Sequence, residues 1–153
     1  MYEYIWLQKR TTLCRYTKTK LSDHYTYFGV SKFGCKTYNT KDKSLHFFRT
    51  KHDLKLLNAS SINNIKLLKK DFPSDVKVIS RFGDIEERGF HMPADDYTIS
   101  QLLCQSGFNG YYYSAYLPDN IPQEVMLCSP KDHVSFLKRT NPNKTFVSPE
   151  LLA

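Results

Sequence analysis

Short runs of β-forming residues recur along this chain, separated by turn signals and by only about three helical segments. Two clear examples are "SLHFFRT" (44–50) and "GYYYSAY" (110–116), both rich in aromatic side chains. The runs do not alternate regularly with helices, which argues against a doubly wound parallel sheet. We therefore expect an α+β fold, a compact single domain over residues 1–140 with a C-terminal tail over 141–153.

Further β-type runs are predicted to form the rest of the sheet. They are "EYIWLQKRTTLCRYT" (3–17) as one or two strands, "HYTYF" (24–28), "LKLLN" (54–58), "DVKVIS" (75–80) and "EVMLCS" (124–129). The segment 82–95 is predicted to be an irregular polar loop.

The helical segments are marked by their caps. Ser60 or Ser61 precedes apolar residues at helical spacing, and Pro73 ends that segment. A second helix is expected to start at Asp95 or Asp96 and to close at Gly107. "VSKFGCKTYNTKD" (30–42) is predicted to be a short helix, and "SPKDHVSFLKRT" (129–140) a final turn or helix.

The four cysteines lie far apart and form no CxxC pair. We therefore expect no metal site and no disulfide framework, but reduced and mostly buried thiols. The N-terminus lacks a signal-peptide pattern, and no apolar run approaches the ~20 residues that span a bilayer. These features predict a cytoplasmic or nuclear protein with no membrane partner.

The net charge of +7 is unevenly distributed along the chain. Residues 1–70 hold 15 Lys and Arg against four acidic residues, whereas residues 71–153 hold seven against 11. This asymmetry indicates a positive face that attracts an anion, such as nucleic acid, a dinucleotide or an acidic protein. The alternative is a lysine-rich surface that is merely solvated.

The stretch "YTYFGVSKFGCKTY" (25–38) is the most unusual part of the chain. It combines three tyrosines, two phenylalanines and two glycines without an acidic residue. Tyr27 and Tyr38, 11 positions apart, could form core packing, a stacking platform for bases, or two walls around a flat heterocycle. Two isolated charges are further candidates: Arg15 in "TLCRYT", suited to a diphosphate, and Glu124 at the start of an apolar run.

Read together, these residues carry a resemblance. "YTYFGVSKFGCKTY" resembles the tyrosine-pair segment of the poly- and mono-ADP-ribosyltransferase catalytic domain, and "QEVMLCSPKDHVSFL" resembles its late strand, which opens on a catalytic glutamate. "TLCRYT" falls where that family has its first-strand motif. The resemblance covers most of residues 10–138. It implies a domain with short, mainly antiparallel strands in two sheets around an NAD cleft.

The resemblance also implies roles for individual residues. Tyr27 and Tyr38 would sandwich nicotinamide, and Arg15 would contact the ribose or diphosphate of NAD. Ser31 and Thr17 would be further polar contacts to NAD. Glu124 would hydrogen-bond the nicotinamide ribose and stabilise the oxocarbenium-like transition state. NAD would be a substrate, no metal would be needed, and ADP-ribose would pass to a protein or nucleic-acid acceptor.

The chain also departs from the family pattern. Tyr16 stands where the family has a small glycine, and Pro122 replaces the first acidic or amide residue of the arginine-modifying relatives. Whether the protein is an enzyme is therefore open. The alternative is a non-catalytic basic module, either a pseudoenzyme with a blocked pocket or a nucleic-acid-binding protein. The Lys-, Asn- and Tyr-rich composition is consistent with an AT-rich genome, such as a viral one.

Overall fold

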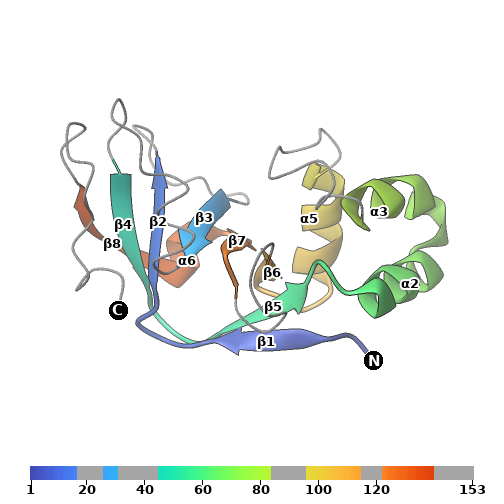
Figure 1. Cartoon of the computed structure of the whole chain (residues 1–153), viewed down its shortest axis with the longest axis horizontal. Coiled ribbons are helices and arrows are strands. Elements are labelled where there is room, and N and C mark those ends of the chain that lie inside the picture. The colour runs from blue at the N-terminus through green and yellow to red at the C-terminus, as the bar shows by residue number, and fades with distance from the viewer. Residues whose placement is uncertain (17–25, 31–44, 84–95, 115–121, 140–153) are drawn as a thin grey trace.

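The computed structural model describes residues 1–16, 26–30, 45–83, 96–114 and 122–139. Within them the chain forms an α+β domain in which three helices gather at one end, beside β5 and β6 (Figure 1). The strands are β1 (Tyr4–Leu7), β2 (Thr12–Tyr16), β3 (Thr26–Val30), β4 (Leu45–Thr50), β5 (Leu54–Asn58), β6 (Gly110–Tyr113), β7 (Glu124–Leu127) and β8 (Val134–Arg139). The helices are α2 (Ile62–Asp71), a 3-10 turn η1 (Pro73–Asp75), α3 (Val76–Gly83), α5 (Asp96–Gln105) and the short α6 (Pro130–His133).

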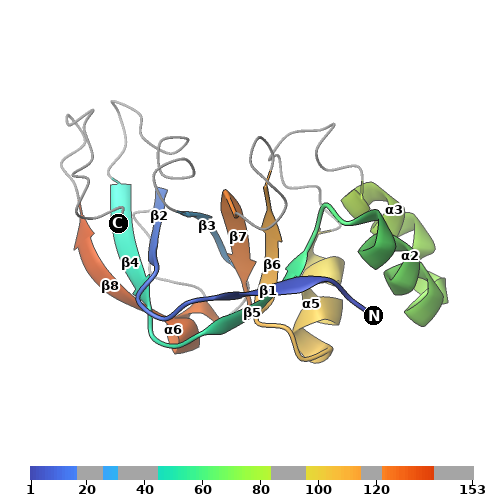
Figure 2. The ribbon, with the colours of Figure 1, turned by 60° about the horizontal axis from the view of Figure 1, so that its bottom comes forward.

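The described strands form one hydrogen-bonded sheet in the order β1-β5-β6-β7-β3-β2-β4-β8. Only the β5–β6 pairing is parallel, so the sheet is mainly antiparallel, as predicted. The prediction of two separate sheets is not matched, because β7 and β3 pair and join the two halves of the sheet. Figure 2 shows the strands from β8 to β6 side by side in a curved row.

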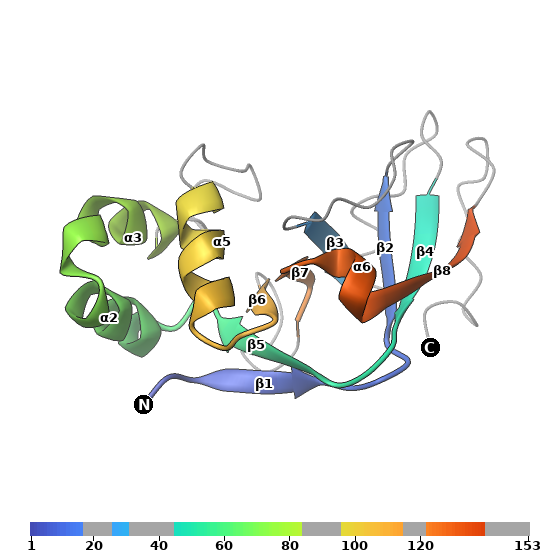
Figure 3. The same cartoon turned by 180° about the vertical axis from the view of Figure 1, so that it is seen from behind.

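A paired ribbon of strands turns a sharp corner and so bends the sheet. β1 continues into β2, and β4 continues into β5. These two segments stay paired on both sides of the bend, β2 with β4 and β1 with β5 (Figure 3). At the corner the backbone N–H of Arg10 donates to the carbonyl of Thr50, and the N–H of Lys9 donates to Asp53 at 2.7 Å. Arg10 takes a positive φ of 69°, a conformation that is uncommon for a non-glycine residue and fits the sharp turn here.

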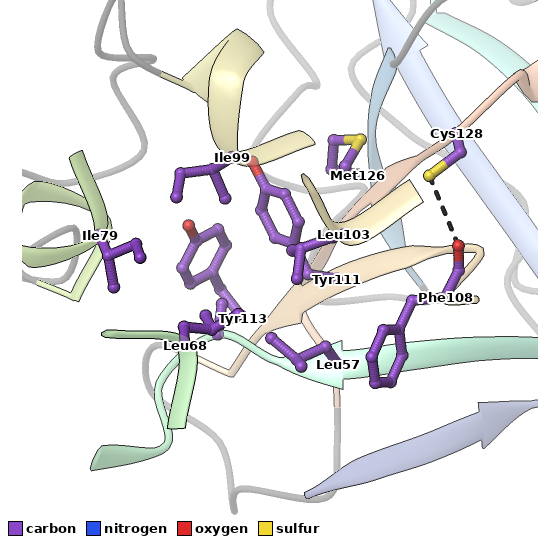
Figure 4. Packing of buried hydrophobic residues seen from close by; sticks show 11 residues of the cluster. Leu57, Leu68, Ile79, Ile99, Leu103, Phe108, Tyr111, Tyr113, Met126 and Cys128 are labelled. Atoms are coloured by element: carbon purple, nitrogen blue, oxygen red, sulfur yellow. Dashed lines mark hydrogen bonds between the residues drawn. The ribbon is translucent and has the colours of Figure 1, made fainter. Parts of the chain in front are cut away.

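The bend creates two apolar cores on opposite faces of the central strands. One lies within the curved sheet and draws buried side chains from every strand, including Leu13, Phe28, Phe48, Tyr112 and Val125. The other lies between β5–β6–β7 and the helices. Its members include Leu57, Leu68, Ile79, Leu103, Tyr111, Tyr113 and Met126 (Figure 4).

The helices begin and end largely where the sequence indicates. Ser61 is the N-cap of α2, and its side chain accepts a hydrogen bond from the N–H of Asn64. The helix ends just before Pro73, and Gly107, with φ of 93°, follows α5. None of the described helices is long and apolar enough to cross a bilayer.

One predicted strand is wrong, and one predicted turn or helix is matched only over its first residues. Residues 75–80 were expected to be a strand, but Val76–Gly83 is helical, because Ile79 is fully buried in the core beside α5 and tertiary packing outweighs the β-propensity of valine. The segment 129–140 contains only one helical turn and then β8, which pairs with β4. The loop predicted over 82–95 overlaps the end of α3, and its residues from 84 on lie outside the described residues. The same holds for 31–42 of the predicted helix over 30–42, whose first residue ends β3, and for the predicted tail over 141–153.

The cysteines also differ from expectation. Cys104 at the end of α5 and Cys128 after β7 form a disulfide with Cα atoms 5.9 Å apart. Cys14 is disulfide-bonded too, so the described cysteines are not free thiols. The sulfur of Cys128 also lies 3.7 Å from the carbonyl oxygen of Phe108, but a disulfide sulfur carries no proton, so we regard this as a packing contact (Figure 4). Disulfides are typical of oxidising compartments, and a cytoplasmic or nuclear location stays a prediction.

A histidine pair fastens the corner to α6. The ring nitrogens of His52 and His133 lie 2.9 Å apart, and the N–H of Lys51 donates to the carbonyl of His133. Burial, followed by the positive charge of His52, lowers the pKa of His133, which Lys51 lowers further and Asp132 partly restores. A hydrogen bond between two imidazoles needs one neutral ring nitrogen as acceptor, so protonating both rings breaks the contact.

We expect the free energy of unfolding to fall as the pH drops below about 6.5, the usual pKa of histidine. The pKa of His133 is lowered in the folded protein, so the unfolded chain binds the proton first and acid favours unfolding until folded His133 is protonated as well. Urea unfolding at pH 8 to 5 measures this. His46 also has a lowered pKa, so the same measurement on the His133→Gln variant is needed to separate the two histidines. Equal pH dependence of the unfolding free energy in the variant and the unaltered protein would contradict the assignment to His133.

Candidate functional site

Glu124 is the first residue of β7, a strand in the interior of the sheet with β6 on one side and β3 on the other. Only 5% of this residue is exposed. Gln123, the residue before Glu124, is hydrogen-bonded to both neighbouring strands. Its N–H donates to the carbonyl of Tyr113, and its carbonyl accepts from the N–H of Val30. A glutamate is seldom this buried, so its position is a stronger sign of function than an exposed carboxylate would be.

Cross-strand register determines which residues lie beside Glu124. It is opposite Gly29 of β3 and opposite Tyr113 of β6. Residues in register point to the same face of a sheet, so Glu124 and Tyr113 lie on the face covered by the helices. Gly29 has no side chain, so no Cβ on β3 lies directly beside Glu124.

Tyr27 lies two positions before Gly29 and therefore on the same face as Glu124. It is in register with Met126, the next residue of β7 on that face. A diagonal relation of this kind brings side chains within about 7–8 Å, so Tyr27 and Glu124 are close neighbours. The sequence predicts that these two residues share a site. They lie on neighbouring strands of one face, and the shared NAD site stays a prediction.

The ring of Tyr27 is held in place by Tyr111. The two hydroxyls are hydrogen-bonded to each other, and the rings meet edge to face with centroids 5.9 Å apart. Tyr111 in turn contacts Tyr113 edge to face at 5.5 Å. Figure 4 shows the rings of Tyr111 and Tyr113 extending from β6 toward α5. Tyr27 is half-buried and also packs against the core between the sheet and the helices, so its ring is held in a fixed position.

Arg15 is not brought onto this face. Cys14 is in register with Gly29, so the next residue, Arg15, points to the other side of β2. Its guanidinium carbon lies 5.8 Å from the centre of the Phe28 ring, within the curved sheet. The sequence placed Arg15 in the same cleft as Glu124, whereas the register separates the two side chains by the thickness of the sheet.

The remaining predicted site residues are Tyr38, Ser31 and Thr17, all outside the described residues. Residue 16 ends β2 in register with Leu45. Its side chain lies outside the described part of the structure, so whether Tyr16, which stands where the family has a small glycine, blocks the pocket is untested. The described residues contain no group of three or more His, Cys, Asp or Glu side chains that could hold a metal ion.

Sequence reasoning missed Tyr111 and Tyr113 as neighbours of the candidate site. "GYYY" was predicted as a strand, but its partner strands could not be read from the sequence. Glycine at position 110 is the signal for close approach here, because a Cβ at that position would lie 1.7 Å from the backbone oxygen of Met126. The tight contact between β6 and β7 therefore requires glycine.

Comparisons with protein-family models, with curated proteins and with solved structures found no match to this chain. The class of protein that the described residues define is accordingly an α+β domain with one bent, mainly antiparallel sheet and a buried carboxylate beside a fixed tyrosine.

Proposed function

We propose that this protein is an ADP-ribosyltransferase that binds NAD over the face of β3 and β7 carrying Tyr27 and Glu124. The observation that carries the proposal is the placement of the buried carboxylate of Glu124 and the fixed ring of Tyr27 on neighbouring strands of one face. This is the pairing of residue types that the resemblance to the ADP-ribosyltransferase family implies. The chain order, with the tyrosine before the glutamate, is also that of the family.

The chemistry requires few protein groups. The bond between C1′ of the nicotinamide ribose and the ring nitrogen breaks, and both bonding electrons leave with nicotinamide, which departs neutral. The positive charge left on the ribose develops beside the Glu124 carboxylate, which stabilises it. An acceptor nucleophile then forms a bond to C1′ and releases one proton, which balances the reaction.

Each residue has a distinct part in this proposal. Glu124 is the catalytic residue, and the Tyr27 ring forms one wall for the nicotinamide. Tyr38 is proposed as the second wall, with Ser31 and Thr17 as polar contacts, on the strength of the family resemblance alone. Arg15 receives no contact with NAD, because it lies on the opposite face of the sheet.

Incubation of the protein with NAD labelled in the adenylate phosphate tests this function. The expected result is nicotinamide release together with transfer of label to the protein itself, to added acidic protein or to nucleic acid. If neither product forms between pH 6 and 9 while the protein remains folded, the non-catalytic binding module becomes the better interpretation.

A further inference from the structure

Three basic side chains occupy one row across the opposite face of the sheet. Arg15 of β2 is in register with His46 of β4, and His46 is in register with Arg139 of β8. Neighbouring strands lie about 4.8 Å apart, so the backbone positions of the three basic residues span only about 10 Å across the sheet. The row lies on the face of Phe28 and Phe48, the reverse of the face that carries Glu124.

Aromatic rings adjoin this basic row. The Arg15 guanidinium lies over Phe28, and the His46 ring is 6.1 Å from the ring of Phe136. Phe136 is held by an edge-to-face contact with Phe48 at 5.7 Å, yet 58% of it is exposed. The exposed Phe136 ring, which packs against Phe48, therefore presents a flat surface next to the three basic groups.

The charges in the row act on one another. Burial, then the positive charges of Arg139 and Arg15, lower the pKa of His46. The Nδ1 atom of His46 is buried and makes no hydrogen bond among the described residues. Like charges directly opposite one another repel, and an anion bound across the row would offset this repulsion.

We propose that Arg15, His46 and Arg139 bind a phosphate group of a nucleotide whose base stacks on Phe136. Arginine forks suit phosphate oxygens, and an aromatic platform beside a basic row is how single-stranded nucleic acids are commonly held. The same chemistry is presented by a free mononucleotide and by one unit of a strand. This site is separate from the proposed NAD face and does not depend on that function.

The experiment uses two probes, adenosine monophosphate and a fluorescein-labelled single-stranded 12-nucleotide RNA, each titrated against the full chain. Arg139→Glu and Phe136→Ala alter exposed side chains of β8. Lys138→Glu is the matched control, because this exposed residue is in register with Phe47 and thus on the other face of the sheet. Binding is measured by anisotropy at 50 to 200 mM salt and by the NMR titration of His46.

We expect Arg139→Glu to weaken binding at least tenfold, through loss of a charge-assisted contact and repulsion of the phosphate, and Phe136→Ala about fivefold or more, through loss of stacking. Lys138→Glu should change affinity less than about threefold at 150 mM salt, where charges on the far face are screened. Bound phosphate should raise the pKa of His46, because an anion favours the protonated ring.

The two probes distinguish the source of the nucleotide. Saturable binding of adenosine monophosphate without a gain from the strand identifies a free nucleotide, and much tighter, salt-dependent binding of RNA identifies a nucleic acid. Equal losses in Arg139→Glu and Lys138→Glu, or no saturable binding of either probe, would overturn the proposal. So would loss of binding in Glu124→Gln but not in Arg139→Glu, since the nucleotide would then occupy the Glu124 face.

Discussion

Replacing Glu124 with glutamine is expected to lower the rate of nicotinamide release about 10²–10³-fold. Removing one preorganised group that stabilises transition-state charge has an effect of this size. Glutamine keeps the shape of the side chain but cannot carry the negative charge that, in the proposed reaction, faces the developing cation. The measurement is the single-turnover rate of nicotinamide release from NAD, with circular dichroism and urea unfolding to verify the fold.

Asp132→Asn is the matched control for this variant. It also removes one negative charge, but from an exposed residue of α6 that lies outside the candidate site. Its turnover should stay within about twofold of the unaltered protein, because surface charges are screened by salt. Undiminished turnover in a folded Glu124→Gln protein would show that this carboxylate is not catalytic.

Removing the disulfide between Cys104 and Cys128 is the second change with a large expected effect. The bond joins the end of α5 to the residue after β7 across a sequence separation of 24. Loop-closure entropy of the unfolded chain predicts a loss of about 3.5 kcal/mol in the free energy of unfolding for a loop of this length. The variant is Cys104→Ala with Cys128→Ala, measured by urea unfolding at a fixed pH.

The double variant leaves Cys14 in place, so the comparison isolates one disulfide. Alkylation of the native protein followed by peptide mass mapping provides the control, and residues 104 and 128 should be protected from alkylation until a reductant is added. Two results together would contradict the bond. The free energy of unfolding of the double variant would lie within about 1 kcal/mol of that of the unaltered protein, and both cysteines of the native protein would be alkylated without a reductant. The protein would then carry reduced thiols as its sequence suggested.

The disulfide also has a consequence for the candidate site. Cys128 follows β7, the strand that begins with Glu124, and Cys104 lies on the helix that covers Tyr111 and Tyr113. The bond therefore ties the helix to the strand and holds the tyrosine cluster between them. We expect reduction to loosen the packing around Tyr27 as well as to lower stability.

Arg15 shows how one residue of register changes an interpretation. In sequence it precedes the tyrosine pair, as a basic residue does in the resembling family, and so was grouped with Glu124. The pairing of Cys14 with Gly29 turns Arg15 to the reverse face, because side chains alternate along a strand. On that face it lies beside His46 and Arg139. Neither residue stood out in the sequence, and the row could not be predicted because β8 was not predicted as a strand.

Local signals in the sequence determined most of the elements. Aromatic-rich runs of β-forming residues predicted β4 and β6, and the Ser61 cap with Pro73 predicted the limits of α2. These signals depend on neighbours within one or two turns of chain, so they can be read without knowing the fold. That Tyr27 and Glu124 share a site is implied by chain order and the family resemblance, and it stays a prediction, although the two residues do lie on neighbouring strands.

Only the tertiary structure decided the contacts between distant segments. It made Val76–Gly83 a helix, because burial of Ile79 against α5 outweighs a β-type pattern. It joined Cys104 to Cys128, since disulfide geometry depends on spatial and not sequential proximity. It also placed Arg15 and Glu124 on opposite faces, because register is set by long-range pairing, whereas the sequence determined only that both residues lie in strands.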